Sequence, residues 1–248
     1  MTADLKDFIS PPKKEVILTG DRPTGPLHLG HYVGSLQNRV LLQEENTQFV
    51  MIADAQALTD HAKCPDQIKA HVIEVAIDYL SVGIDPEKTT IFIQSQIPAL
   101  FEIGTYFLNL VTWNRLKHNP TVKEEIVQKG FGEHVPAGFM VYPVFQAADI
   151  TAFLASIVPV GSDQVPMIEE TRSLVEKFNR TYHTDVLVKP RPYLPKHPRL
   201  PGTNGMSKMS KTLGNAIFLK DPIDRMQKLV KKMPSDPNHK KIEDPGVV

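Results

Sequence analysis

Two histidines, His28 and His31, lie three residues apart directly after a segment rich in proline and glycine. Side chains at this spacing at the start of a helix can face one ligand. Gly30 lies between them, and its missing side chain would let a flat adenine ring or a phosphate approach the helix backbone. Two histidines alone are more often surface residues at a helix cap, and no further ligand has the spacing of a metal site. The pair therefore indicates a nucleotide site only together with other groups.

The basic segment Lys208-Met209-Ser210-Lys211-Thr212 is the second group with suitable chemistry. It follows a flexible loop, as a lid that closes over phosphates requires. Two lysines on such a loop can meet the charge that builds on a pyrophosphate leaving group, and Ser210 can donate to a phosphate oxygen. A basic loop alone is usually solvated surface. The occurrence of both groups, in this order, is far more specific for a nucleotide site than either one.

Tyr142, Gln146 and Asp149 form a third group, because their spacing of i, i+4, i+7 places them on one face of a predicted helix. Pro143 is expected near the first turn of that helix. A polar stripe on an otherwise apolar helix is costly inside a core without partners. The stripe therefore predicts a ligand pocket first and a structural hydrogen-bond network second.

Gly161, Asp163 and Gln164 follow a short apolar run and form a fourth group at the predicted end of a strand. Gly161 allows close approach of a ligand. Asp163 suits a ribose hydroxyl, and Gln164 can accept from an α-ammonium group. These residue types predict contacts to the sugar and to the amino group of substrates.

The elements that must position these groups alternate between short apolar runs and amphipathic helical patterns. The predicted strands are 15–19, 48–53, 89–93 and 157–160, and the predicted helices are 29–45, 65–82, 166–182 and 222–232. Residues 98–138 are helical but irregular, as an insertion would be, and 189–205 is expected to be a loop. This order predicts an α/β fold, a Rossmann-like doubly wound parallel sheet that binds ligands beyond the carboxyl ends of its strands.

Composition limits the partners and the compartment. The 248 residues carry 28 basic and 28 acidic side chains, so bulk charge gives no argument for a nucleic-acid partner. A single cysteine, Cys64, excludes an internal disulfide and fits a reducing cytosol. Residues 1–12 do not resemble a signal peptide, and no apolar run has the length of a membrane span. We therefore expect a cytoplasmic protein without a membrane partner.

The first two groups resemble the two signatures of class I aminoacyl-tRNA synthetases. His28-Leu29-Gly30-His31 is similar to His-Ile-Gly-His, and Lys208–Thr212 is similar to Lys-Met-Ser-Lys-Ser with a hydroxyl kept at Thr212. In that family the histidines support the triphosphate and the glycine lies beneath the adenine. The resemblance implies catalytic roles for His28, His31, Lys208, Ser210 and Lys211. It implies an ATP site made of Arg22, Gly30, His31, Gly161, Asp163, Lys208, Met209 and Lys211.

A longer match resembles the tryptophanyl-tRNA synthetases and extends over nearly the whole chain. It includes the segments 20–25, 55–61, 93–96 and 157–161. By this resemblance Asp149 accepts the indole N–H, Tyr142 lines the pocket with Gln146, and Gln164 holds the amino group. Tyrosyl-tRNA synthetases are the rival, since they use a similar stripe.

Three departures from the tryptophanyl pattern leave the pocket contacts open. This chain has two histidines where many of these enzymes have Thr-Ile-Gly-Asn. Gln146 stands where a methionine is common, and Arg22 stands where a glutamine is common. Arg22 could instead meet the α-phosphate or the substrate carboxylate.

The resemblance implies activation of tryptophan with ATP and Mg²⁺ and transfer to tRNA(Trp). It also implies a homodimer built partly by residues 98–138, where the apolar side chains of Leu100, Phe101, Phe107, Leu110 and Trp113 could be core or dimer surface. Residues 1–212 are expected to form the catalytic domain, with a helical insertion at about 98–141. Residues 213–248 would begin a helical anticodon-binding domain that is too short to fold alone, which suggests a shortened chain with impaired transfer.

Two other functions stay open. The first is a degenerate synthetase-like protein that binds a ligand and has lost catalysis. The second is a different nucleotidyltransferase with a His-x-Gly-His motif. The intact histidines and lysines argue against the first, and the lysine loop and the Asp149 helix argue against the second.

Overall fold

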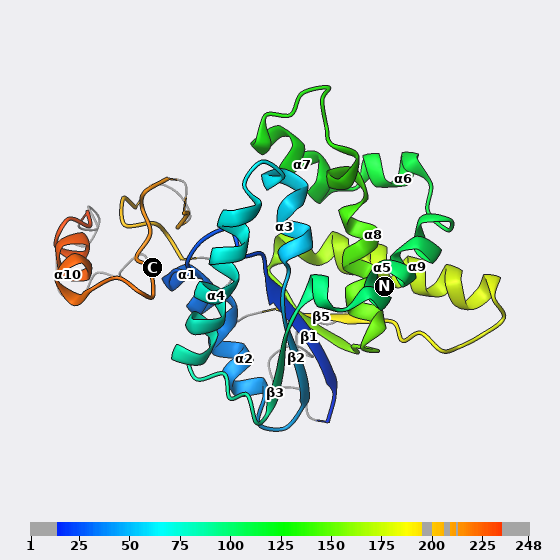
Figure 1. Cartoon of the computed structure of the whole chain (residues 1–248), viewed down its shortest axis with the longest axis horizontal. Coiled ribbons are helices and arrows are strands. Elements are labelled where there is room, and N and C mark those ends of the chain that lie inside the picture. Colours follow the sequence, from blue (N-terminus) through cyan, green and yellow to red (C-terminus); the bar gives the residue numbers. More distant parts are fainter. Residues whose placement is uncertain (1–13, 195–199, 206–208, 212, 235–248) are drawn as a thin grey trace, which may run out of the picture.

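A parallel sheet of five strands forms the centre of the computed structural model, which describes residues 14–194, 200–205, 209–211 and 213–234. The strands lie in the order β3-β2-β1-β4-β5 (Figure 1). Their bounds are β1 Val16–Asp21, β2 Thr47–Ile52, β3 Thr89–Ile93, β4 Ile157–Pro159 and β5 Arg191–Tyr193. The chain reverses its direction across the sheet between β1 and β4, which is the switch point where such sheets bind ligands. The predicted doubly wound α/β fold is confirmed.

Strand β5 corrects the prediction of an uninterrupted loop at 189–205. Its residues pair with β4 in parallel, with Val158 opposite Pro192. Proline lowers strand propensity and cannot donate a ladder hydrogen bond, which is why the pattern looked like a loop. At the edge of the sheet the missing N–H costs little, because the outer side of the strand has no partner strand to bond.

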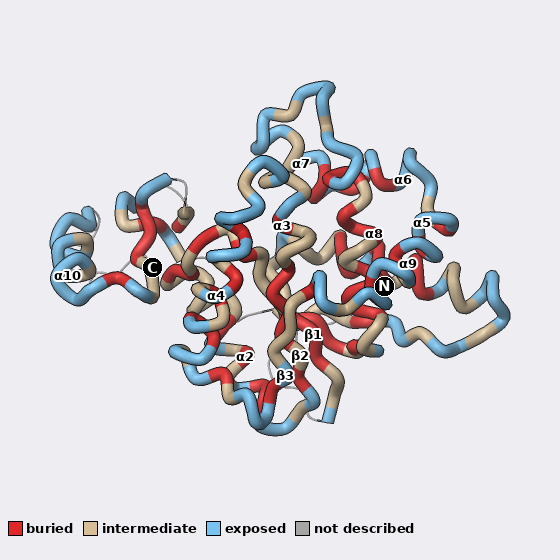
Figure 2. Tube along the Cα trace, in the orientation of Figure 1, coloured by how far each residue is buried: buried red, intermediate tan, exposed pale blue. Residues whose placement is uncertain are grey.

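Helices cover both faces of the sheet (Figures 1 and 2). On one face Val50 and Ile52 of β2 pack with helices α2 (Gln37–Leu42) and α4 (Pro65–Ser81) in a buried cluster. On the other face Leu18 and Val158 pack with α8 (Ala137–Ala152) and α9 (Val165–Thr181). The alternation of side chains along each strand divides the core between the two faces.

The segment predicted as one helix at 29–45 contains a π-helical turn. The structure has α1 at Leu29–His31, the π turn η2 at Tyr32–Leu36, and then α2. The backbone N–H of Gln37 donates to the carbonyl of Tyr32, which is an i to i−5 bond. Single π turns of this kind occur frequently at functional sites.

Helix α3 (Asp54–His61) and helix α4 follow β2. The apolar residues Ile68, Val72 and Val75 of α4 are buried, whereas Ile77 and Leu80 are 57% and 50% exposed. Val72 and Val75 pack against Val50 and Ile52 of β2.

The region after β3 begins with the 3-10 turn η3 (Gln94–Gln96) and continues as helices α5 (Pro98–Leu108), α6 (Trp113–His118) and α7 (Pro120–Lys129). Leu100, Phe107 and Leu110 are buried in the core, whereas Phe101 and Trp113 are 36% and 58% exposed. Of the five apolar residues that the sequence could not assign to core or surface, three therefore belong to the core and two to the surface.

Helix α8 begins earlier than the sequence indicated, at Ala137. Pro143 consequently lies inside the helix and not near its first turn. Such a proline removes one backbone hydrogen bond. The helix nevertheless continues to Ala152, and most of its residues are buried between α5 and α9.

The last described segment carries helix α10 (Ile223–Lys231), which Figure 1 shows beyond α4, away from the sheet. Within the described part of the chain none of its residues is buried. The chain leading to it is attached by backbone hydrogen bonds, from Leu29 to Ile217 and from Leu219 to Leu27. No helix among the described residues is both long and apolar enough to cross a membrane.

Candidate active site

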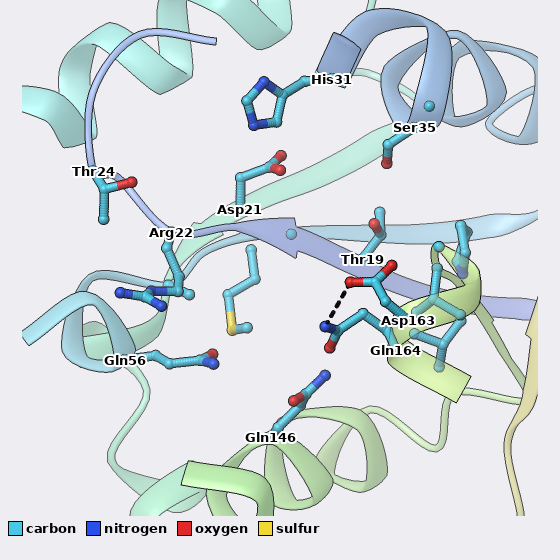
Figure 3. Close-up of a pocket in the computed structure, with 18 of the residues that line it drawn as sticks. Thr19, Asp21, Arg22, Thr24, His31, Ser35, Gln56, Gln146, Asp163 and Gln164 are labelled. Carbon is cyan, nitrogen blue, oxygen red and sulfur yellow. Dashed lines mark hydrogen bonds between the residues drawn. The ribbon is translucent and has the colours of Figure 1, made fainter. Parts of the chain in front are cut away.

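A cavity of about 700 Å³ opens at the carboxyl ends of β1 and β4, between α1 and α8. Figure 3 shows His31, Arg22, Gln146 and Gln164 around it, each coming from a different segment. Every expected site residue in the described ranges lines this cavity: Arg22, His28, Gly30, His31, Tyr142, Gln146, Asp149, Gly161, Asp163, Gln164, Met209, Ser210 and Lys211. Lys208 and Thr212 lie outside the described residues.

The two histidines pack against each other at the start of α1. Their ring centroids are 3.8 Å apart. The backbone N–H of His28 donates to Nδ1 of His31 at 3.2 Å, so the proton of the neutral His31 ring lies on Nε2. His31 can therefore donate a hydrogen bond from Nε2.

Both rings are neutral at physiological pH. Burial, assisted by His31 and Lys211, lowers the pKa of His28 to about 3. Burial also lowers the pKa of His31 to about 4, although Asp21 opposes the shift. Neutral imidazoles next to a lysine can donate hydrogen bonds to phosphate oxygens without adding to the positive charge of the site.

Gly30 allows the His28 ring to lie against the helix start. A Cβ atom at Gly30 would lie 2.9 Å from Cε1 of His28 and 3.5 Å from Cβ of Met209. The space that the sequence suggested for a nucleotide is thus partly filled by the His28 ring. Gly30 shapes the histidine pair as well as the cavity wall.

A network of Asp21, Arg39 and Tyr79 lies next to the histidine pair, and the sequence analysis did not predict it. Arg39 is 2% exposed, and its Nη1 donates to Oδ2 of Asp21 at 2.6 Å. The Tyr79 hydroxyl donates to the same oxygen at 2.9 Å. Burial alone would raise the pKa of Asp21, but Arg39, His31 and Tyr79 outweigh it and lower the pKa to about 2. Asp21 is therefore a stable negative charge beneath the site.

Lys211 reaches across to the first signature loop. Its Nζ donates to the carbonyl of Gly25 at 2.7 Å. Burial lowers the pKa of Lys211, while Asp21 and Asp78 oppose that shift. The lysine is thus partly desolvated and close to the histidine pair, where a phosphate would meet it with little screening by water.

Asn215 organises the loop that carries Ser210 and Lys211. The buried Asn215 side chain accepts from the backbone N–H of Ser210 at 2.9 Å and donates to Asn204 at 3.3 Å. Its own carbonyl accepts from the backbone N–H of Thr203 at 2.9 Å. One asparagine therefore links the two sides of the loop.

Asp149 lies at the buried end of the cavity. It is 1% exposed, and burial raises its pKa to about 7 despite a hydrogen bond from Gln94. Nε2 of Gln94 donates to Oδ2 at 2.8 Å. Oδ1 is buried and has no hydrogen-bond partner among the described residues. An acceptor of this kind fits a ligand that brings one N–H or O–H donor.

A second polar cluster forms the wall between α3 and α7. Asp60 forms ion pairs with Arg22 and Lys129 and a hydrogen bond of 2.7 Å with Nδ1 of His61. Burial would raise the pKa of Asp60, but Lys129, Arg22 and His61 lower it. Arg22, which was expected to face ATP, is thus already held by a carboxylate at the cavity wall.

Tyr142 donates a hydrogen bond of 2.9 Å from its hydroxyl to Oε2 of Glu125. Burial and the neighbouring Glu125 raise the pKa of Tyr142, so its hydroxyl stays protonated. Burial also raises the pKa of Glu125. The aromatic ring therefore has a fixed position in the cavity wall, with its polar end satisfied on α7.

Asp163 and Gln164 lie in the 3-10 turn η4 (Ser162–Gln164), between β4 and α9. Nε2 of Gln164 donates to Oδ2 of Asp163 at 3.2 Å, as the dashed line in Figure 3 shows. A Cβ atom at Gly161 would lie 2.6 Å from Oδ1 of Asp163, so glycine is needed for this arrangement. Both side chains face the cavity from the side opposite Arg22 (Figure 3).

Each of the missed site residues has at least one partner that is distant in the sequence. Asp21 follows the rule that polar residues at strand carboxyl ends face a ligand, and this signal could have identified it. Gln94 follows β3 in the same way. Arg39, Asp60 and Tyr79 lie inside helical patterns, where no local signal separates them from surface residues.

The described residues contain no group of three or more histidine, cysteine, aspartate or glutamate side chains arranged to hold a metal ion.

Comparison with known proteins gives one family. The sequence model of the tRNA synthetases class I (W and Y) matches residues 12–247. Over 240 residues the chain is 62% identical to the tryptophan–tRNA ligase of Streptococcus pyogenes serotype M3, covering 95% of this chain and 71% of that protein. The tryptophan–tRNA ligase of Lactococcus lactis is equally similar at 62% and is covered to 70%.

Solved structures agree with the sequence matches. The tryptophanyl-tRNA synthetase of Campylobacter jejuni in complex with ADP and tryptophan is 29% identical, with a TM-score of 0.79 over 90% of this chain and 68% of that one.

Proposed function

Because the chain belongs to the class I tRNA synthetases of the tryptophan and tyrosine type, we propose that its central cavity carries out amino-acid activation with the side chains described above. The activity is that of a tryptophan–tRNA ligase: tryptophan and ATP form tryptophanyl-adenylate and pyrophosphate, and the tryptophanyl group passes to tRNA(Trp). The tyrosine alternative is not favoured, since the relatives at 62% identity are tryptophan enzymes.

The observation that carries the site assignment is convergence on one cavity. The histidine pair, Lys211 of the second signature and the buried Asp149 come from three distant segments and line the same space. Burying a lysine and a carboxylate beside one cavity costs free energy. Such perturbed groups cluster at functional sites, which argues against a protein that has lost its ligand.

The first signature and the lysine segment bind the triphosphate. His31 donates from Nε2, and the His28 ring packs against it at a tilt of 49° and supports it. As the tryptophan carboxylate attacks the α-phosphorus, negative charge moves to the leaving pyrophosphate. Lys211, together with Lys208 and Ser210, meets that charge, which stabilises the transition state more than the ground state. Asp21 keeps the histidine end oriented through its buried network.

The other end of the cavity binds tryptophan. Oδ1 of Asp149 accepts the indole N–H, and Tyr142 and Gln146 line the ring on the same face of α8. Gln164 receives the α-ammonium group and Asp163 a ribose hydroxyl, after their mutual hydrogen bond opens. Gly30, Gly161 and Met209 complete the wall of the ATP site.

Arg22 contributes to ATP binding from the wall opposite Asp163. Its ion pair with Asp60 holds the guanidinium in place, with Lys129 as a second cation on the same carboxylate. Because two cations, Arg22 and Lys129, share one carboxylate, the cluster keeps a net positive charge that favours the phosphates or the substrate carboxylate.

Mg²⁺ bound together with ATP would supply positive charge that neutralises part of the phosphate charge. The residues lining the cavity offer Asp21 and Asp163 as carboxylates near the phosphate side, which suits a cation held mainly by its nucleotide.

The exposed Phe101 and Trp113 in the region 98–138 suit a homodimer surface. Residues 1–212, with a helical insertion at about 98–141, act as the catalytic domain in the cytoplasm. Residues 213–248 lead into a helical domain that reads the anticodon, and the exposed helix α10 is its first element.

ATP–pyrophosphate exchange with tryptophan and with tyrosine tests the activation step. We expect exchange with tryptophan alone. Exchange with tyrosine alone would assign the pocket to the sister enzymes. Silence with both amino acids, on protein shown to be folded by circular dichroism, would favour a binding protein without catalysis.

A further inference from the structure

Gln94 lies directly behind Asp149, at the carboxyl end of β3. It is 2% exposed and does not line the cavity. Its Oε1 accepts from the backbone N–H of Gln56 at 3.0 Å, and its Nε2 donates to Oδ2 of Asp149 at 2.8 Å. A backbone N–H can only donate, so it fixes which end of the amide points to Asp149. Gln94 is therefore held as a donor.

This contact leaves Asp149 with one acceptor for a ligand. Oδ2 is occupied by Gln94, whereas Oδ1 is buried and lacks a hydrogen-bond partner among the described residues. A buried carboxylate oxygen without a partner is costly, and the cost is relieved when a substrate brings a donor. The number of acceptors that Asp149 presents is thus set from behind the pocket.

We propose that Gln94 is a positioning residue that makes the pocket selective for a ring carrying an N–H donor, because it binds Oδ2 of Asp149 and so leaves Oδ1 as the acceptor for the ligand. The inference rests on the proposed function, since it concerns the same tryptophan pocket. Gln94 acts through Asp149 and does not touch the substrate.

Charge supports the geometry. Burial raises the pKa of Asp149 to about 7, and the Gln94 hydrogen bond is the one side-chain contact that lowers it. Titratable groups elsewhere on the cavity wall are Asp21, Arg22, His28, His31, Arg39, His61, Glu125, Lys129, Tyr142, Asp163 and Lys211. Charged groups on helices packed against α8 are Asp54 and Asp60 on α3, Glu102 on α5, Arg115 and Lys117 on α6, and Glu169, Glu170, Arg172, Glu176, Lys177 and Arg180 on α9. None of these groups is among the causes of the Asp149 shift.

The test compares Gln94→Glu with Gln96→Glu in the full chain. The Gln94→Glu side chain keeps the shape and the acceptor for Gln56, but it cannot donate to Asp149 unless it takes up a proton. Gln96 lies in the same turn η3 and is exposed, so it is the matched control. A second variant, Gln94→Met, removes the donor without adding charge.

The assay is tryptophan-dependent ATP–pyrophosphate exchange from pH 6 to pH 8.5, with the melting temperature recorded for each variant. In the unaltered chain the KM for tryptophan should fall as pH rises through about 7, because Asp149 ionises. Loss of a hydrogen bond to a charged group corresponds to roughly a tenfold effect or more. We expect both Gln94 variants to raise the KM for tryptophan at pH 7 by about that factor, with kcat and the KM for ATP nearly unchanged.

Two further readouts separate positioning from packing. With Gln94→Met the midpoint of the KM profile should move upward by about one pH unit, whereas a packing defect would raise KM equally at every pH. Discrimination against a tryptophan analogue with sulfur in place of the indole N–H should also fall in both variants. Gln96→Glu should match the unaltered chain in all readouts.

Two outcomes would overturn the inference: Gln94 variants that bind tryptophan like the Gln96 control, or a raised KM without a change in the midpoint or the discrimination. Absence of exchange in the unaltered chain would contradict the proposed function instead, so the two failures are distinguishable.

Discussion

The substitution Asp21→Asn removes the negative charge beneath the histidine pair and keeps the shape of the side chain. The Tyr79 hydroxyl can still donate to the amide oxygen, so the main loss is the charge facing Arg39. Arg39 is 2% exposed and would remain as a buried cation without a counter-charge. Removing one partner of such a pair is strongly destabilising.

The pKa shift gives the magnitude. The pKa of Asp21 falls from an ordinary 3.8 to about 2, which corresponds to about 2.5 kcal/mol of folding free energy. This lies below the 3–5 kcal/mol typical of a broken buried pair. The smaller value is reasonable because Arg39 keeps its bonds to Ser35 at 3.1 Å and to the Gly20 carbonyl at 3.3 Å. The melting temperature should fall by roughly 5–10 °C.

The pH dependence has a definite sign. Because the folded pKa is depressed, the stabilisation is fully present above the unfolded value of about 3.8 and is lost as pH falls toward about 2. Urea unfolding should therefore show a constant difference between the two proteins from pH 8 to pH 5. The difference should begin to close below pH 4.

A double variant and a surface control test the reasoning. Asp21→Asn combined with Arg39→Met removes the uncompensated charge and should be more stable than Asp21→Asn alone. Glu44→Gln breaks the exposed pair with Lys88 and should leave stability nearly unchanged, because solvent screens such a pair. If the double variant were less stable than the single one, the account of a buried uncompensated charge would be refuted.

Three further predictions concern the reaction. Lys211→Ala should slow adenylate formation about 100-fold in single-turnover assays and weaken ATP binding far less, because the charge that Lys211 contacts is largest in the transition state. An equal loss in both would contradict this role. The control is Lys220→Ala, which breaks the exposed ion pair with Glu74. Gly30→Ala should displace the His28 ring, which lies 2.9 Å from the new Cβ, and slow activation at an unchanged melting temperature. Gly138→Ala should have no effect, because its Cβ would meet only Thr59 at 4.0 Å. Equal activity of both variants would show that the ring position is unimportant. Asp149→Asn should raise the KM for tryptophan roughly 10- to 100-fold and abolish its pH dependence near pH 7, and a persisting pH dependence would assign that titration to another group.

The sequence was sufficient for the fold class and for some of the residues that line the cavity, but not for Asp21 or Arg39. Strand β3 has the predicted bounds of Thr89–Ile93, because a continuous apolar run is typical of a buried parallel strand. The convergence of Gly30, Asp149 and Gly161 on one cavity follows from the parallel topology, which brings the carboxyl ends of neighbouring strands together.

Tertiary contacts decided the features that the sequence did not reveal. The Pro192 edge strand forms because β4 offers a free edge, and Pro143 is tolerated because α8 is packed on both sides. The Asp21–Arg39 pair and the Gln94–Asp149 contact join segments 18 and 55 residues apart. No local pattern encodes a buried ion pair or hydrogen bond, so such contacts become visible only when the elements have been placed.

The π turn η2 sets the angular phase between His31 and Arg39. These residues are eight apart, and in an uninterrupted α-helix eight residues overshoot two turns by about 80°. A turn closed by an i to i−5 bond takes roughly one residue more, which removes most of the overshoot. His31 and Arg39 can then lie on the same side of the helix and approach Asp21 together. The length of this segment is consequently as constrained as its side chains: deletion of one residue between Tyr32 and Leu36 would rotate His31 by about 100° relative to Arg39, a change that no substitution can mimic.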